Sequence, residues 1–203
     1  MTSGRAVAVD IGTGDGKYVL AAAAAHPDTF FVGLDADASR MREASRRGAP
    51  ALFVVAAAEA PPGELAGRAT EVTVHFPWGS LLRGVLGIDA DVLAGIAAIA
   101  APGATIRALV SVTDRDRAAP AEALREAAAL ARRYASCGLT LECVRPASAE
   151  EIRSSRSTWA KRLSVGSTSR PSWLVHAVKE RDGRVCGGDQ RSWPGGGGWQ
   201  VGQ

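Results

Sequence analysis

Short, largely apolar runs alternate with amphipathic segments along the first half of the chain. Four of these runs predict strands that are buried in a sheet; they are RAVAVDI (5–11), TFFVGLD (29–35), ALFVVAA (51–57) and EVTVHF (71–76). Two intervening segments predict helices; they are GKYVLAAAAAH (16–26) and ASRMREASRRG (38–48), the second ended by Gly48.

The second half continues the alternation with longer helical segments. Helices are predicted at DADVLAGIAAIA (89–100), with Pro102 and Gly103 just past its end, and at AEALREAAALARRYASCG (121–138), closed by a glycine. Strands are predicted at ATIRALVSV (104–112), LTLECVR (139–145) and WLVHAVKE (173–180).

This order of elements is typical of an α/β fold, in which helices cover both faces of a mostly parallel sheet. The last two strands are joined without a full-length crossover helix, which predicts one antiparallel member. The 203 residues suit one domain of ordinary size. We therefore expect a single domain over residues 1–182. The Gly- and Trp-rich segment 183–203 buries too little surface to offset its ordering entropy, so we expect a flexible tail there.

Composition narrows the compartment and the class of partner. Hydrophobic residues make up 46% of the chain, the net charge is +3, and the pI is about 9.0, which permits a nucleic-acid partner without requiring one. The three cysteines, at 137, 143 and 186, lack the spacing of a metal site or a disulfide framework. No apolar run approaches the roughly 20 residues that cross a bilayer. We expect a cytoplasmic protein without a metal and without membrane contact.

Residues 9–16, VDIGTGDG, follow a predicted strand and open a predicted helix, which is the context of a nucleotide-binding glycine loop. Asp10 stands two positions before the first glycine. Its carboxylate would repel a pyrophosphate but attract an ammonium or a sulfonium group. Asp35 ends the second predicted strand, where a carboxylate accepts hydrogen bonds from the ribose hydroxyls of an adenosine.

These features favour S-adenosylmethionine over a dinucleotide. The pattern D-x-G-x-G-x-G resembles the first motif of class I methyltransferases, whereas dinucleotide-binding domains carry G-x-G-x-x-G and the third glycine here comes one place too early. Ala58 and Glu59 follow the third strand at the edge where such sheets bind ligands, and a solvated loop carboxylate is the alternative interpretation of Glu59. The expected cofactor residues are Asp10, Gly12, Thr13, Gly14, Gly16, Asp35, Ala58 and Glu59.

Two segments carry tryptophans near the edge at which open α/β sheets bind their substrates. HFPWGSLLRGVLG (75–87) comes at the end of the fourth strand. In it Trp78 directly follows Pro77, and the proline stiffens the loop. STWAKRL (157–163) places Trp159 in a basic stretch between the last two strands. An exposed tryptophan beside lysine and arginine is uncommon unless a ring stacks on it. Ordinary packing of both indoles is the alternative.

Together, VDIGTGDG, FPWGSLLRGVLG and WAKRL resemble the aminoglycoside-resistance methyltransferases of 16S ribosomal RNA, which modify N1 of adenine 1408 in the decoding site. The resemblance covers about residues 6–180. It implies the class I methyltransferase Rossmann-like fold, with seven mostly parallel strands and one antiparallel strand. It also implies S-adenosylhomocysteine as a product and the 30S subunit as partner. We expect the enzyme to be a monomer.

The resemblance further implies roles for individual residues. Trp78, preceded by Pro77, and Trp159 correspond to the two tryptophans that clasp the flipped adenine, and Ser157 to a hydroxyl near that base. Lys161 and Arg162 correspond to RNA-facing cations. Arg170 matches an arginine that grips the backbone of the target, provided that the linker has gained a residue.

The RNA-facing surface also includes arginines of the second predicted helix. Arg40, Arg46 and Arg47, with Arg42, either dock RNA phosphates or form an ordinary solvated face. The chain is shorter than the family before Arg5 and in REASRRGAP (42–50), so we expect weaker docking on the ribosome.

Other functions stay open at this stage: a tRNA guanine-N7 or small-molecule methyltransferase, or a non-enzymatic RNA-binding protein. N1 of adenine carries a lone pair and no proton, so its methylation needs no general base, and no Ser-His-Asp or Cys-His set stands out in the sequence. Catalysis would then depend on orientation and electrostatics. We expect His26 to cap a helix and His75 and His176 to be structural.

Overall fold

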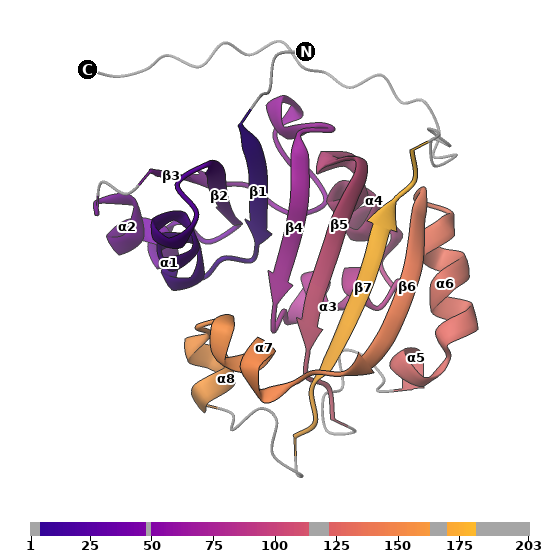
Figure 1. Cartoon of the computed structure of the whole chain (residues 1–203). Helices are drawn as coiled ribbons and strands as arrows, with labels where there is room; N and C mark the ends of the chain where they lie inside the picture. Colours follow the sequence, from indigo (N-terminus) through magenta and orange to yellow (C-terminus); the bar gives the residue numbers. More distant parts are fainter. Residues whose placement is uncertain (1–4, 48–49, 114–121, 163–169, 182–203) are drawn as a thin grey trace.

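A computed structural model describes residues 5–47, 50–113, 122–162 and 170–181, and the expected tail at 183–203 lies outside them (Figure 1). The strands are β1 (Ala6–Ile11), β2 (Thr29–Asp35), β3 (Ala51–Val55), β4 (Ala69–His75), β5 (Ala100–Val110), β6 (Leu139–Pro146) and β7 (Trp173–Lys179). The helices are α1 (Lys17–Ala25), α2 (Ala38–Ser45), the 3-10 turn η1 (Gly63–Leu65), α3 (Gly79–Val85), α4 (Ala90–Ile99), α5 (Glu122–Arg125), α6 (Ala127–Ala135), α7 (Ala149–Ser154) and α8 (Thr158–Arg162).

The strands form one seven-stranded sheet in the order β3-β2-β1-β4-β5-β7-β6. β7 runs antiparallel to both of its neighbours, β5 and β6, while the remaining pairs are parallel. This confirms the expected mixed sheet with one reversed strand. The carboxyl ends of β1, β2 and β4 meet at one edge, which is where loops of an open α/β sheet bind ligands.

Helices cover both faces of the sheet, as the alternating elements predict. Successive side chains of a strand point to opposite faces. Ala8 and Phe31 pack with Val19 of α1, whereas their neighbours Val9 and Val32 join the main core, to which α3, α4, α5 and α6 contribute. Figure 1 shows α1 and α2 together beside β1 and β2. His26 is the C-terminal cap of α1, as expected.

Two predicted elements differ from the structure. β5 begins at Ala100, directly after α4, so Pro102 and Gly103 lie inside the strand instead of in a loop before it. A register shift between β4 and β5 accommodates them, because proline has no N–H to donate to the ladder. The helix predicted over residues 121–138 is divided into α5 and α6, since Glu126 leaves the helical conformation with φ −87° and ψ 59°.

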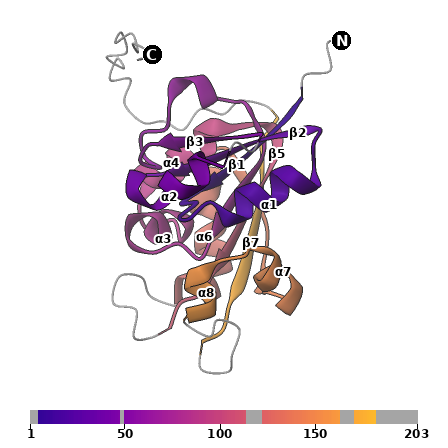
Figure 2. The same cartoon turned by 90° about the vertical axis from the view of Figure 1, so that its left-hand side faces the viewer.

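Between β6 and β7, α7 and α8 lie beyond the carboxyl ends of β4 and β5 (Figures 1 and 2). A small apolar cluster attaches them to the sheet, in which Phe76 and Leu109 bury Ala160 of α8 and Ile152 of α7 packs alongside. Helices this short gain little from local propensity, so these contacts determine their position.

Glu151 attaches α7 to the sheet through hydrogen bonds with arginines of two strands. Its Oε1 accepts a hydrogen bond from Arg145 of β6 at 2.7 Å and another from Arg107 of β5 at 3.2 Å. Glu151 and Ser148 also form a capping box at the start of α7. The hydrogen bonds from Arg145 lower the pKa of Glu151 to about 2. The carboxylate is therefore charged at neutral pH and α7 stays anchored.

Gly95 of α4 leaves room for the segment that follows β3. A Cβ on Gly95 would lie 1.9 Å from the carbonyl oxygen of Ala58 and 3.1 Å from Cα of Glu59. We expect Gly95→Ala to lower the free energy of unfolding by about 1–3 kcal/mol, because the buried clash outweighs the better helix propensity of alanine. Urea denaturation measures this change. The matched control is Gly63→Ala, whose Cβ would meet nothing within 4 Å; equal stability of the two variants would contradict the prediction.

Candidate functional site

The glycine loop that follows β1 is held by the end of β2. The N–H of Gly12 donates to the carbonyl oxygen of Leu34 at 2.7 Å. The N–H of Gly14 donates to Asp35 Oδ2 at 2.8 Å, and the N–H of Asp37 donates to Asp35 Oδ1 at 2.9 Å. Gly12 and Gly14 adopt φ values of 72° and 56°, which are strained for other residues. The Asp35 carboxylate is thus fixed in place, with lone pairs left for a ligand.

Two adjoining cavities open at this edge of the sheet. The linker cavity, of about 470 Å³, lies between the glycine loop and the linker that carries α7 and α8; its lining includes Asp10, Thr13, Tyr18, His75, Trp78 and Ser157. The Asp35 cavity, of about 420 Å³, includes Asp35, Ala58, Glu59, Pro77, Trp78 and Leu81. Both cavities share Gly12, Arg40, Phe76 and Trp78, so they meet at Trp78.

The floor of the linker cavity is polar. Asp10 is only 3% exposed, and its Oδ1 accepts a hydrogen bond from Thr73 Oγ1 at 2.7 Å. His75 Nδ1 lies 3.1 Å from the same oxygen without hydrogen-bond geometry. The buried hydroxyl of Thr13 has no hydrogen-bond partner. Because buried polar groups are nearly always paired, the Thr13 hydroxyl indicates that a polar ligand belongs in this cavity.

Tyr18 completes this floor. Its ring meets the ring of His75 edge to face, with centroids 4.3 Å apart. Burial, followed by the charge of Asp10, raises the pKa of Tyr18 to about 12, so the phenol stays neutral. Tyr18, which no motif in the sequence marks, and His75, for which we expected a structural role, both line the cavity.

Trp78 presents an indole to solvent where the cavities meet, with 64% of its surface exposed. Its neighbours hold the backbone: Pro77 is buried, and Phe76 is buried in the left-handed conformation with φ 49°. The guanidinium carbon of Arg40 lies 5.8 Å from the Trp78 ring centroid, and Arg40 Nε donates to Asp37 Oδ2 at 3.2 Å. A large exposed aromatic ring held by a rigid backbone is a stacking platform.

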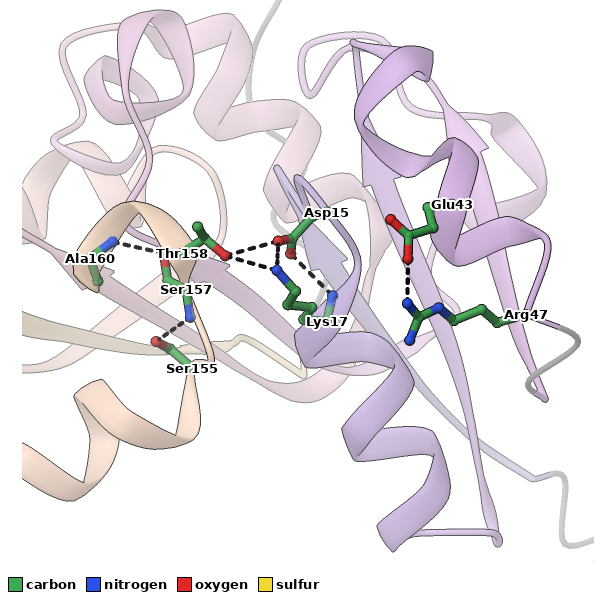
Figure 3. A network of polar contacts seen from close by, with 8 residues as sticks. All are labelled: Asp15, Lys17, Glu43, Arg47, Ser155, Ser157, Thr158 and Ala160. Carbon is green, nitrogen blue, oxygen red and sulfur yellow. Dashed lines mark hydrogen bonds and ion pairs between the residues drawn. The ribbon is translucent and has the colours of Figure 1, made fainter. Parts of the chain in front are cut away.

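A polar bridge joins α8 to the glycine loop (Figure 3). Thr158 Oγ1 donates to Asp15 Oδ2 at 2.9 Å, and Lys17 Nζ lies 2.6 Å from the same oxygen and 3.1 Å from Thr158 Oγ1. Burial by itself would raise the pKa of Asp15, but the hydrogen bonds from Lys17 and Thr158 lower this pKa overall. The bridge fixes the backbone of Trp159, the next residue, relative to the loop; the side chain of Trp159 lies outside the described part.

Most of the expected cofactor and target residues converge on the two cavities. Gly16 lines neither cavity; it opens α1 with φ 69°, and a Cβ there would lie 2.6 Å from Cβ of Ala44 and 2.7 Å from Phe53. It serves close packing of α1 and α2. The following expected cofactor and target residues line a cavity: Asp10, Gly12, Thr13, Gly14, Asp35, Ala58, Glu59, Pro77, Trp78 and Ser157.

The expected RNA-binding residues are more scattered. Arg40 lines both cavities, whereas Arg46, Arg47, Lys161 and Arg170 line neither, and Arg47 is paired with Glu43 one turn earlier (Figure 3). The Arg162 side chain lies outside the described residues. Arg156 and Thr158, which sequence analysis missed, also line the linker cavity; their only signal in the sequence is proximity to Trp159.

Neither a metal centre nor a membrane span is found in the described residues. Over the ranges given above, no three His, Cys, Asp or Glu side chains are grouped so that they could hold a metal ion. No helix in that part of the chain has the length and apolar character needed to span a bilayer.

Comparisons with known proteins agree on one family. The family described as NpmA, 16S rRNA (adenine(1408)-N(1))-methyltransferase, matches residues 1–179. A curated protein of that activity from Streptoalloteichus hindustanus is 37% identical over 176 residues, covering 77% of this chain and 80% of the relative. One from Escherichia coli is 31% identical over 180 residues, covering 79% and 81%.

Solved structures give the same result. A tryptophan-to-alanine variant of the 16S rRNA (adenine(1408)-N(1))-methyltransferase from Catenulisporales acidiphilia, crystallised with the cosubstrate SAM, superposes with a TM-score of 0.74 at 32% identity, covering 88% of this chain and 87% of that one. The 16S rRNA methyltransferase KamB gives a TM-score of 0.74 at 33% identity, covering 86% and 88%.

Proposed function

Because this chain belongs to the NpmA family of 16S rRNA (adenine(1408)-N(1))-methyltransferases, we propose that it transfers a methyl group from S-adenosylmethionine to N1 of adenine 1408, conferring aminoglycoside resistance. One observation supports the proposal independently of the family match. Trp78 offers an exposed indole at the junction of a carboxylate-lined cofactor cavity and a second cavity of comparable size. That arrangement suits a flipped base presented to a bound methyl donor.

The residues present fit S-adenosylmethionine. In our proposal the Asp35 cavity takes the adenosine, with the Asp35 carboxylate accepting from the ribose hydroxyls and Ala58 and Glu59 beside the adenine. Asp10 and the unpaired Thr13 hydroxyl face the methionine end, where a buried carboxylate favours a cationic ligand. We propose no metal in the reaction.

In the proposed reaction the protein positions the substrates and stabilises charge. It does not have to supply a proton acceptor. When bound, S-adenosylmethionine supplies an electrophilic methyl group, which passes to the lone pair of adenine N1 as its bond to sulfur breaks and S-adenosylhomocysteine is left. No proton leaves N1, so neither His75 nor Tyr18 has to act as a base. The side chains of Trp78, Trp159 and Ser157 hold the base, and Pro77 keeps Trp78 rigid.

The indoles also favour the transition state. As the methyl group is transferred, the adenine ring gains positive charge, and an indole face attracts a cation by roughly 0.5–2 kcal/mol. The interaction is stronger in the transition state than in the bound substrate, so it raises the rate and not only the affinity.

RNA docking in this proposal uses positive charge on the same side of the molecule. Arg40 lines both cavities, Lys161 and Arg162 belong to α8, Arg170 precedes β7, and Arg46 and Arg47 follow the end of α2. We further propose that residues 1–182 form the catalytic domain, that it acts in the cytoplasm on the 30S subunit, and that it works as a monomer.

A small-molecule methyltransferase is the principal rival. It would enclose its substrate in an apolar pocket, whereas Trp78 is 64% exposed and its cavity is lined by carboxylate, hydroxyl and guanidinium groups. A non-enzymatic RNA-binding protein would have no use for the fixed Asp35 carboxylate.

The direct test incubates the purified protein and labelled S-adenosylmethionine with 30S subunits, free 16S rRNA or tRNA, followed by primer extension. We expect label in 30S subunits and a block to extension at adenine 1408. Label in tRNA alone would overturn the proposal, and no label in any RNA would favour a non-enzymatic protein.

The Thr158 bridge yields a further prediction. Thr158→Val keeps the shape of the side chain but removes its hydrogen bonds with Asp15 and Lys17. We expect kcat for 30S methylation to fall by about 3- to 10-fold, because each lost hydrogen bond costs about 0.5–1.5 kcal/mol and α8 becomes less well placed. Cofactor affinity, measured by calorimetry, should stay within about twofold. Thr158→Ser is the matched control and should retain the rate; a loss in Thr158→Ser equal to that in Thr158→Val would contradict a role for the hydroxyl.

A further inference from the structure

The amino-acid end of S-adenosylmethionine carries a carboxylate as well as an ammonium group. The proposed function assigns this end of the cofactor to the linker cavity, where the buried carboxylate of Asp10 attracts the ammonium and sulfonium groups. The same negative charge repels the carboxylate of the cofactor. A carboxylate that leaves water needs a cation or hydrogen-bond donors in exchange. A complete site for the cofactor therefore needs such a group in this cavity, apart from Asp10.

The described lining of the linker cavity holds two aspartates and two arginines. Asp15, the second aspartate, is engaged by a lysine and a threonine. Arg40 is engaged by the carboxylate of Asp37 and lies against the face of an indole. Arg156 is exposed and makes no side-chain hydrogen bond or ion pair with any residue that the structure describes. Arg156 is thus the arginine of this lining whose charge is available to an anionic ligand.

The backbone that carries Arg156 is ordered without a ligand. Arg156 directly follows the end of α7 with φ 52°, in the left-handed region that glycine or asparagine usually occupies after a helix. The Oγ of buried Ser155 donates to the carbonyl oxygen of Ile152 at 2.7 Å and accepts from the N–H of Ser157 at 3.3 Å (Figure 3). Because the turn is already fixed, little backbone freedom is lost when the arginine binds an anion.

Thr13 gives a second indication that an oxygen-bearing ligand belongs here. Its side chain is 8% exposed, and its buried hydroxyl has no hydrogen-bond partner among the described residues. Thr13 belongs to the glycine loop and Arg156 to the linker, so the two segments that border the cavity each contribute a donor to its lining. A hydroxyl and a guanidinium can both donate to carboxylate oxygens, and the guanidinium adds a positive charge.

We propose that Arg156 binds the carboxylate at the amino-acid end of S-adenosylmethionine, with the Thr13 hydroxyl as a further donor. Asp10 and Arg156 then hold the ammonium and the carboxylate of one amino-acid group, which orients this end of the cofactor in the cavity. The inference rests on the proposed function for the identity of the cofactor, and not for the RNA that is methylated. A phosphate of the RNA is the other anion within reach of an exposed arginine, and the test separates the two.

The test measures the binding of two ligands by calorimetry in the absence of RNA. One is S-adenosylmethionine, and the other is decarboxylated S-adenosylmethionine, which keeps the ammonium, the sulfonium and the adenosine but lacks the carboxylate. We expect Arg156→Asn to weaken binding of S-adenosylmethionine by about tenfold, because charged hydrogen bonds are lost, and to weaken binding of the decarboxylated ligand by less than about twofold. Asparagine tolerates the left-handed conformation, so Tm should be unchanged or higher.

Arg153→Gln is the matched control. Arg153 is exposed on α7, one turn before Arg156, and lines neither cavity, so the same charge is removed away from the site. A loss that is confined to Arg156→Asn and to the ligand with the carboxylate, and that Arg156→Lys partly restores, supports the proposal.

Two results would overturn this inference and leave the proposed function standing. One is an equal loss of affinity for both ligands in Arg156→Asn. The other is an unchanged affinity for S-adenosylmethionine together with a raised KM for 30S subunits, which would assign the arginine to the RNA. Modification of an RNA other than 16S rRNA would overturn the proposed function alone, whereas a wild-type protein that binds no S-adenosylmethionine would overturn both.

Discussion

Trp78→Ala is expected to lower kcat/KM for methylation of 30S subunits by about two orders of magnitude. Stacking on an aromatic ring contributes about 1–3 kcal/mol per base, and the attraction of the indole for the developing cation adds about 0.5–2 kcal/mol. A loss of about 3 kcal/mol corresponds to roughly a hundredfold. Because Trp78 is 64% exposed and packs little against the core, the fold should survive the substitution.

Single-turnover methylation gives the rate, and calorimetry with S-adenosylmethionine gives the affinity, which should change by less than about threefold. Trp78→Phe is the matched control, since it keeps a ring for stacking; we expect it to lose less than about tenfold. Trp159→Ala should resemble Trp78→Ala if the second indole grasps the other face of the base. A wild-type rate in Trp78→Ala would mean that the base is held elsewhere.

Asp35→Ala is expected to weaken binding of S-adenosylmethionine by about a hundredfold. The substitution removes the proposed acceptor for the ribose hydroxyls, and hydrogen bonds to a charged group contribute about 1.5–3 kcal/mol. It also frees the N–H groups of Gly14 and Asp37, which the carboxylate now holds at 2.8 and 2.9 Å. The glycine loop would then be less ordered in the free protein, and ordering it on binding would lower the affinity for the cofactor.

Isothermal titration calorimetry measures this change. Asp28→Ala removes an exposed carboxylate in the turn before β2, away from both cavities, and should leave cofactor affinity unchanged. Asp35→Asn should fall between the two, because its amide still accepts one hydrogen bond but cannot accept on both sides. An unchanged affinity in Asp35→Ala would mean that the ribose lies elsewhere.

The sequence alone was informative wherever local pattern and burial agree. Strands of a parallel sheet are buried on both faces, so their apolar runs marked β1 and β2 nearly to the residue. The glycine loop and Asp35 were recognisable because such a turn needs residues that tolerate positive φ, at a fixed distance from the strand ends. Trp78 and Ser157 were predicted from short motifs that resemble a family, not from periodicity.

Tertiary structure decided the features that depend on contacts between distant segments. α7 and α8 are too short to be stable alone and form where Phe76, Leu109 and Glu151 hold them. The start of β5 follows from pairing with β4, which overrides the breaking tendency of Pro102 and Gly103. Gly16 packs helices instead of lining a cavity, and Arg156 is an ordinary arginine in the sequence. The turn after α7, held by Ser155 and Ser157, brings Arg156 to the linker cavity, far along the chain from the glycine loop. Periodicity could not show this, because it records burial within an element and not the meeting of separate elements.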